Sequence, residues 1–260
     1  MPRFAANISF LFTELPFLDR FEAAANAGFE GVEFHYPFEF DPLEIRLRLD
    51  EYGLTPVLMN IRAGNHARGD WGFAGIPGRE ETFRLCVIEA MEYALEIGIR
   101  QINCLAGVKP AEVDVRTCEL TLIDNVRSAA EKFAEFDLTL NLEALNTQDV
   151  PGFLISNTRN AMRLINEIGA KNVMLQYDCY HMQLMEGALI DTIRRLLPRI
   201  GHIQFADAPG RGEPGTGQID FPALFAHLNA LRYKGWVSAE YRPSVRTTDS
   251  LAWMKARRSR

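Results

Sequence analysis

Hydrophobic and polar positions follow two alternating patterns along the chain. Short runs rich in β-branched and aromatic residues alternate with longer segments in which apolar residues recur every three or four positions. That alternation is typical of β-α-β units around a parallel sheet. We expect eight strands, at residues 4–10, 31–36, 55–60, 101–107, 138–145, 173–180, 201–206 and 236–241. Eight such units in one α/β chain predict a single (β/α)8 TIM barrel.

The connecting segments favour one undivided domain. Several helical patterns end in a glycine just before the next strand, as in EYGLTPVL, EIGIRQIN and EIGAKNVM, and glycine readily takes the left-handed conformation of a helix C-cap. No linker rich in Pro, Gly or Ser interrupts the chain. We therefore expect the catalytic barrel to span residues 1–254, and the basic end KARRSR, residues 255–260, to be a disordered tail without a role in chemistry.

Composition and charge restrict the partners. The 28 basic and 34 acidic residues are interspersed and leave a net charge of −6, so neither nucleic acid nor an anionic membrane is an expected partner. The start of the chain lacks a signal-peptide pattern, and no apolar run reaches the length of a transmembrane helix. We expect a cytoplasmic protein that acts on a small molecule, and a homo-oligomer is compatible with the sequence.

The cysteines do not form a disulfide or zinc motif. No CxxC pair occurs, and each cysteine lies in a segment predicted to be buried. We expect all of them to be reduced and structural. They are Cys86, Cys104, Cys118 and Cys179.

The longest interruption between predicted elements follows the third strand. It runs from residue 62 to residue 79 and contains the sequence AGNHARGDWGFAGIPGR. A barrel places its active-site loops after its strands, so this segment is a candidate lid. A plain surface loop is an equal alternative.

Polar side chains recur on one face of the last four strands. In LTLNLEAL, leucines alternate with Thr139, Asn141 and Glu143, so the leucines face the helices and the polar face points into the barrel. The same spacing aims Asp178, Gln204 and Glu240 inward near the ends of the next three strands. A barrel interior is ordinarily apolar, and buried carboxylates are costly unless they bind a cation or one another.

A divalent cation would remove that cost. Three carboxylates and one amide oxygen form an all-oxygen set that suits Mg²⁺ or Mn²⁺, and carboxylate sites also accept Zn²⁺. The predicted ligands are Glu143, Asp178, Gln204 and Glu240. A polar network without metal at the mouth of the barrel is the alternative.

Further side chains near these strand ends are candidates for substrate binding. His181 follows Asp178 by three residues and could hydrogen-bond a substrate oxygen. Arg211, in a glycine-rich loop after the seventh strand, could pair with a substrate carboxylate, and a solvated loop arginine is the alternative. Arg62 and Arg242, each just past a strand, are weaker candidates for the same task.

The remaining histidines divide into two groups. His202, deep in a strand, and His227, in a helix, are expected to be structural. His35 and His66 lie at strand or loop ends, and both roles stay open.

At these residues the sequence resembles the hydroxypyruvate isomerase family, within the xylose-isomerase-like barrels that also include ketose 3-epimerases. The likeness runs nearly end to end through RFAANISF, GIPGREE, INCLAG, NLEALN, QYDCYHMQLMEG, HIQFADAPGRGEPGTGQID and AEYRP. It implies that Glu143 and Glu240 bind metal and form the acid/base pair, with Asp178 and Gln204 as the remaining ligands. The related epimerases usually carry His in place of Gln204, which favours the isomerase branch.

The resemblance also implies a reaction. A metal-assisted isomerase of this type would interconvert hydroxypyruvate and 2-hydroxy-3-oxopropanoate, or tartronate semialdehyde, by proton transfer through an enediolate. A 2-oxo-tetronate isomerase or a ketose 3-epimerase would use the same site, and a sugar-acid binding protein is the alternative without catalysis. A metal-dependent endonuclease of the same barrel group would need more His ligands and a basic groove, and the sequence displays neither.

Overall fold

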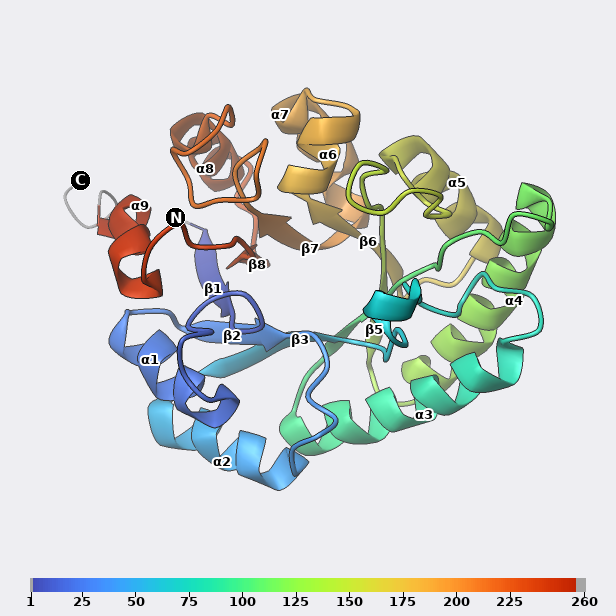
Figure 1. Ribbon diagram of the computed structural model, residues 1–260, viewed down its shortest axis with the longest axis horizontal. Coiled ribbons are helices and arrows are strands. Elements are labelled where there is room, and N and C mark those ends of the chain that lie inside the picture. Colours follow the sequence, from blue (N-terminus) through green and yellow to red (C-terminus); the bar gives the residue numbers. More distant parts are fainter. Residues whose placement is uncertain (1, 256–260) are drawn as a thin grey trace.

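The computed structural model describes residues 2–255, which form a closed barrel of eight parallel strands in sequence order (Figure 1). This confirms the predicted fold. The strands are β1 (Arg3–Asn7), β2 (Gly31–Phe34), β3 (Thr55–Asn60), β4 (Gln101–Cys104), β5 (Thr139–Glu143), β6 (Val173–Asp178), β7 (Ile200–Phe205) and β8 (Trp236–Ala239). β1 pairs with β8 as well as with β2 and thereby closes the sheet.

Several strands end earlier than their apolar runs suggest. The first was expected at residues 4–10 but ends at Asn7, because the N–H groups of Phe10 and Leu11 turn back to the Asn7 carbonyl at 3.1 and 2.8 Å. The fourth was expected to reach residue 107 and ends at Cys104. In both cases the apolar residues that follow are packed in loops at the mouth of the barrel.

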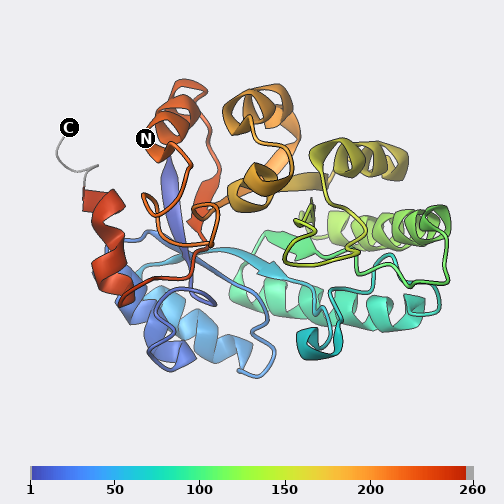
Figure 2. The same cartoon turned by 45° about the horizontal axis from the view of Figure 1, so that its top comes forward.

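Helices surround the strands on the outside (Figures 1 and 2). Side-chain caps of Asp41, Asp114, Asn157 and Asp220 accept backbone N–H groups at four helix starts. Left-handed glycines end three helices, at the positions predicted from the sequence. The helices are α1 (Arg20–Asn26), α2 (Pro42–Tyr52), α3 (Glu80–Ile97), α4 (Val115–Ala134), α5 (Thr158–Ile168), α6 (Cys179–Met185), α7 (Leu189–Leu196), α8 (Phe221–Ala230) and α9 (Ala252–Lys255), with short 3-10 segments at Phe17–Asp19, His66–Arg68, Leu197–Arg199 and Thr247–Leu251.

The inside of the barrel is polar to an unusual degree. Leu140 and Leu142 of β5 pack toward the helices, whereas Asn141 and Glu143 point inward, as predicted. Such interiors are ordinarily filled by branched apolar residues. The buried polar side chains of the strands and their ends are Asn7, Glu33, Asn60, Asn103, Asn141, Glu143, Gln176, Asp178, His202, Gln204, Ser238 and Glu240.

The segment after β3 is only partly a candidate lid. Its second half is packed on the barrel: the N–H of Gly72 bonds to the Ala63 carbonyl at 2.9 Å, and that of Gly75 bonds to the Ala106 carbonyl at 2.8 Å. Residues 64–69 form its exposed tip, where His66 stacks on Trp71 with ring centroids 4.2 Å apart. Any covering role is therefore restricted to that tip.

Two smaller predictions concern the cysteines and the tail. All four cysteines are free and buried. The basic tail at residues 255–260 lies, apart from the last residue of α9, outside the described residues. Within residues 2–255, no helix is both long enough and apolar enough to cross a membrane.

Candidate active site

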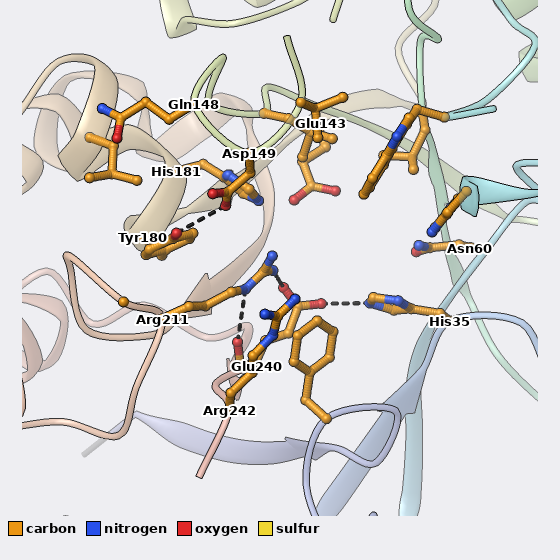
Figure 3. Close-up of a pocket in the computed structure, with 18 of the residues that line it drawn as sticks. His35, Asn60, Glu143, Gln148, Asp149, Tyr180, His181, Arg211, Glu240 and Arg242 are labelled. Carbon is orange, nitrogen blue, oxygen red and sulfur yellow. Dashed lines mark hydrogen bonds and ion pairs between the residues drawn. The ribbon is translucent and has the colours of Figure 1, made fainter. Parts of the chain in front are cut away.

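A cavity of about 590 Å³ opens where the strands end (Figure 3). Glu143 is the last residue of β5, Asp178 is the last of β6, and Glu240 directly follows β8. Parallel strands place these ends at the same mouth of the barrel, where active sites of this fold lie. The wall of the cavity includes Glu143, Glu240, His181, Arg211 and Arg242, together with the aromatic rings of Phe10, Tyr36, Trp71 and Tyr180.

The predicted carboxylates come together around this cavity. Carboxylate oxygens of Glu143 and Asp178 and a ring nitrogen of His181 all lie within 4.8 Å of one another, and all three residues are buried. The guanidinium of Arg211 joins Glu240 to this group, because its Nη2 contacts Glu240 Oε2 and lies 3.5 Å from Asp178 Oδ2. Residues from β5, β6, β8 and the loop after β7 thus form one charged cluster.

The three carboxylates differ in how readily they ionise. Burial raises the pKa of Glu143 well above its ordinary value, and the Glu240 and Asp178 carboxylates raise it further. Burial raises the pKa of Asp178 to about 7, against the opposing charge of Arg211. At Glu240 burial favours the protonated form, but Arg211 and His35 outweigh it and lower the pKa to about 2. More acidic groups converge here than one guanidinium can balance.

These residues fit a divalent cation. The carboxylate oxygens of Glu143, Asp178 and Glu240 are the hard donors that such ions prefer. The Oδ1 atom of Asn103 is buried without a hydrogen-bond partner in the described chain, beside an Nδ2 that donates to Glu143 Oε2 at 2.7 Å. A cation would also relieve the repulsion that raises the pKa of Glu143. The cluster can therefore hold a divalent metal.

His181 is placed as a hydrogen-bond donor rather than as a ligand. Its Nδ1 accepts the Asn146 backbone N–H at 3.1 Å and faces the Asn146 amide nitrogen at 2.7 Å. Burial and the Arg211 charge lower the pKa of His181 well below its ordinary value, which favours the neutral ring. A neutral ring that accepts at Nδ1 carries its proton on Nε2, the atom 3.5 Å from Asp178 Oδ2.

Gln204 lies beneath the carboxylates. Its Nε2 donates to Glu33 Oε1 at 2.7 Å and to Glu240 Oε1 at 3.1 Å. Its Oε1 accepts from Gln176 Nε2 at 2.6 Å. A carbonyl oxygen has two lone pairs, so one remains for a cation.

The arginines take different places. Arg242 lines the cavity beside Arg211 (Figure 3), and its guanidinium has no ion-pair or hydrogen-bond partner among residues 2–255. Arg62 lies apart from these residues: it forms two 2.8 Å hydrogen bonds with Glu89 of α3, its guanidinium lies over Phe38, and it is not part of the cavity wall. The position of Arg62 just past β3 was therefore not enough to predict where its side chain points.

Asn7 on β1, Glu33 on β2 and His35, which directly follows β2, complete the site, although the sequence pattern did not assign them a role. His35 Nε2 lies 2.6 Å from Glu240 Oε1, and Asn7 Nδ2 donates to the same oxygen at 2.8 Å. Glu33 accepts from Asn7 and Gln204 and contacts His202. The alternation in GVEFH, with Val32 and Phe34 buried against the helices, was the available signal.

The fold and the site define a class of protein, the xylose isomerase-like barrels. The family described as Xylose isomerase-like TIM barrel matches residues 21–257. The chain belongs to this family.

Its curated relatives narrow the class to isomerases. The chain is 46% identical over 254 residues to "Hydroxypyruvate isomerase" of Escherichia coli strain K12, with 98% of both sequences covered. It is 43% identical over 255 residues to "2-oxo-tetronate isomerase" of Cupriavidus necator, again with 98% of both covered. The chain is an isomerase of this kind.

Solved structures agree on the fold. A structure titled AP endonuclease, family 2, from Brucella melitensis is 42% identical, has a TM-score of 0.95 and covers 98% of this chain and 99% of its own. The 3-keto-D-glucoside 4-epimerase of E. coli, at 23% identity, has a TM-score of 0.82 with 98% of this chain and 100% of its own covered. The second likeness shows the fold alone.

Proposed function

We propose that this isomerase interconverts hydroxypyruvate and 2-hydroxy-3-oxopropanoate. The observation that carries the proposal is the convergence of Glu143 and Glu240, from the ends of β5 and β8, on one cavity that two arginines also line; one of them, Arg211, lies 3.5 Å from the buried Asp178. The reaction moves a hydrogen between adjacent carbons of a small anionic substrate. It therefore needs a carboxylate to take the carbon-bound proton, a group to return it, and cations to hold the substrate.

A divalent metal would be held by Glu143, Asp178, Gln204 and Glu240. Mg²⁺ or Mn²⁺ suits this oxygen set best, and Zn²⁺ is the third candidate. When bound, the metal polarises the substrate carbonyl and makes the neighbouring carbon-bound hydrogen more acidic. Two observations support a cation beside Glu143: the buried Oδ1 of Asn103 has no hydrogen-bond partner in the described chain, and the pKa of Glu143 is raised.

The two glutamates would act as the acid/base pair. A model carboxylate has a pKa near 4, far below that of a carbon acid, so the proton moves only if the surroundings stabilise the enediolate. Glu143 and Glu240 are 5% and 2% exposed, so little of either side chain contacts bulk water. His35 and Asn7 hold Glu240 in a fixed orientation.

The cavity offers separate partners for each end of the substrate. His181 would donate its Nε2 proton to a substrate oxygen near Asp178. Arg242, with its free guanidinium at the cavity wall, would pair with the substrate carboxylate, while Arg211 would bind an oxygen nearer the two glutamates. Arg62 has no part in this arrangement because Glu89 holds it elsewhere.

The choice of substrate depends on the comparison of two close relatives. Identities of 46% and 43% to isomerases named for hydroxypyruvate and for 2-oxo-tetronate differ too little to separate them. The GEPGTGQID stretch of the loop after β7 resembles the hydroxypyruvate enzymes, which supports our choice. A 2-oxo-tetronate would use the same glutamates and metal.

The test is a set of time courses with Mg²⁺ or Mn²⁺ and an EDTA control. Hydroxypyruvate, a 2-oxo-tetronate and a ketohexose are offered in parallel, and the product of each is followed, 2-hydroxy-3-oxopropanoate by coupled reduction. We expect metal-dependent turnover that is fastest on hydroxypyruvate. Faster turnover of a 2-oxo-tetronate would replace hydroxypyruvate as the proposed substrate of this site. Inactivity on all three compounds would contradict the proposed reaction and favour a binding protein.

A further inference from the structure

Glu33 is a buried carboxylate that the proposed ligand set leaves unused. It lies on β2 with an exposed fraction of 0%, and it does not form part of the cavity wall. In the sheet it is the direct neighbour of Asn7 on β1. A carboxylate in such a place is costly unless donors surround it, so its contacts indicate its purpose.

Three nitrogen atoms converge on Glu33. Asn7 Nδ2 and Gln204 Nε2 donate to Oε1 at 2.9 and 2.7 Å, and His202 Nε2 lies 2.6 Å from Oε2. The other ring nitrogen of His202 has no partner in the described chain, so an unprotonated Nδ1 costs least and Nε2 carries the proton. Glu33 is therefore an acceptor for three N–H groups.

These contacts cross the barrel. His202 and Gln204 both lie on β7, whereas Glu33 lies on β2, 169 and 171 residues earlier in the chain. Two of the three donors thus come from a strand that is not its neighbour. The Glu33 carboxylate therefore links β2 to β7 through side chains inside the barrel.

One consequence is the orientation of the Gln204 amide. A half-turn of that amide would place its Oε1 against Glu33 Oε1, where Nε2 now donates at 2.7 Å, and two acceptors repel at that distance. Glu33 therefore keeps the nitrogen on its own side and leaves the oxygen, with its spare lone pair, as the atom that can meet a cation.

The second consequence concerns Glu240. Asn7 Nδ2 lies between Glu33 Oε1, at 2.9 Å, and Glu240 Oε1, at 2.8 Å. Gln204 Nε2 bridges the same two oxygens, at 2.7 and 3.1 Å. Two amide nitrogens that hold the Glu240 carboxylate are thus themselves held by Glu33.

We propose that Glu33 is a positioning residue: it holds the amides of Gln204 and Asn7 so that Gln204 presents its oxygen, and Glu240 its carboxylate, to the divalent cation. The proposal rests on the proposed metal-assisted function. Partners that orient metal ligands commonly change metal affinity by about tenfold to a hundredfold when they are removed. If Glu33 had only a structural role, its replacement would lower the stability of the fold, because buried donors would lose their acceptor, but it would leave the Mn²⁺ dissociation constant unchanged.

The test is Mn²⁺ binding without substrate, measured by electron paramagnetic resonance on the full-length protein. Glu33→Met removes the acceptor at similar length. Glu33→Gln keeps an Oε1 that can accept from Asn7 and Gln204, while its amide nitrogen can face a His202 ring protonated on Nδ1. Glu119→Met is the matched control, since Glu119 is also buried, at 6% exposed, but pairs with Arg163 and Arg116 on the outer helices.

We expect the Mn²⁺ dissociation constant to rise about tenfold to a hundredfold in Glu33→Met, to return close to the wild-type value in Glu33→Gln, and to stay unchanged in Glu119→Met. Wild-type affinity in Glu33→Met would overturn the role of Glu33 and leave the proposed function intact. Absence of Mn²⁺ binding by the wild type would instead overturn the metal site and, with it, this inference. If Glu33→Met does not fold, Glu33→Asp replaces it: its shorter carboxylate keeps the charge but loses the reach to Gln204, and unchanged Mn²⁺ affinity there contradicts the proposal.

Discussion

Arg211 is the cation that stabilises the acidic cluster of the metal-free protein, and its removal should be measurable as a loss of stability. Its Nη2 contacts Glu240 and lies 3.5 Å from Asp178, and its side chain is only 14% exposed. Removing one partner of a buried ion pair costs about 3–5 kcal/mol, and the residual exposure favours the lower end. We expect Arg211→Met to lose about 3 kcal/mol of unfolding free energy at pH 8, which for a chain of this size lowers the melting temperature by about 6–12 °C.

The loss should depend on pH and on metal. Burial raises the pKa of Asp178 to about 7 even beside Arg211, and it raises the pKa of Glu143 well above its ordinary value. At pH 5 Asp178 is protonated in the folded protein, so the guanidinium has less negative charge to balance and the loss should shrink. Saturating Mn²⁺ should also reduce the loss, because a divalent cation replaces the missing positive charge.

The assay is thermal and urea denaturation of wild type and variant, without metal at pH 5 and pH 8 and with Mn²⁺ at pH 8. Arg242→Met is the control, since the Arg242 guanidinium has no carboxylate partner in the described chain and its loss should change stability by less than about 0.5 kcal/mol. An equal loss for Arg211→Met under all three conditions, or none at pH 8, would refute the electrostatic role assigned to Arg211.

Three further predictions concern other groups of the site. Burial raises the pKa of Asp178 from 3.8 to about 7, so between these pH values the folded chain binds more protons than the unfolded chain. The metal-free protein should therefore lose at most about 4 kcal/mol of stability as pH rises through this window. In Asp178→Asn, the melting temperature should change less between pH 5 and pH 7.5 than in the wild type. The Asp207 carboxylate accepts backbone hydrogen bonds in the loop that carries Arg211, from the N–H groups of Ala208, Gly215, Gly217 and Ile219. Asp207→Asn should weaken these bonds and thereby raise KM about tenfold in steady-state assays, while the Mn²⁺ dissociation constant stays unchanged. An unaltered KM would contradict this role. Glu143→Gln and Glu240→Gln should each abolish turnover while circular dichroism reports an intact fold, and a near-normal rate in either variant would remove that glutamate from the mechanism.

The strand pattern was sufficient to predict the carboxylate cluster, for a physical reason. Side chains of a strand alternate between its two faces, so the leucines that pack on the helices also determine that Glu143 points inward. The same rule applied to GVEFH would have found Glu33 and His35, whose neighbours Val32 and Phe34 pack outward. These two residues were predictable in principle.

The loop residues were not predictable in this way. Arg211 has a left-handed backbone conformation, with φ of 58°, and contacts Glu240 at the end of the neighbouring strand β8. Arg62 lies closer to a strand end in sequence, two residues past β3 against six past β7 for Arg211, yet it pairs with Glu89 on a helix 27 residues later. Periodicity does not extend beyond the strand, so the direction of each of these arginines depends on tertiary contacts.

The most direct test of proton transfer by the two glutamates is turnover of hydroxypyruvate by the Mn²⁺-loaded enzyme in deuterium oxide, with carbon-bound deuterium in the product measured by nuclear magnetic resonance. A proton held by a glutamate exchanges with solvent in some turnovers, so we expect deuterium at the carbon that receives the hydrogen. Complete retention of the original hydrogen would contradict the acid/base account and favour a hydride shift.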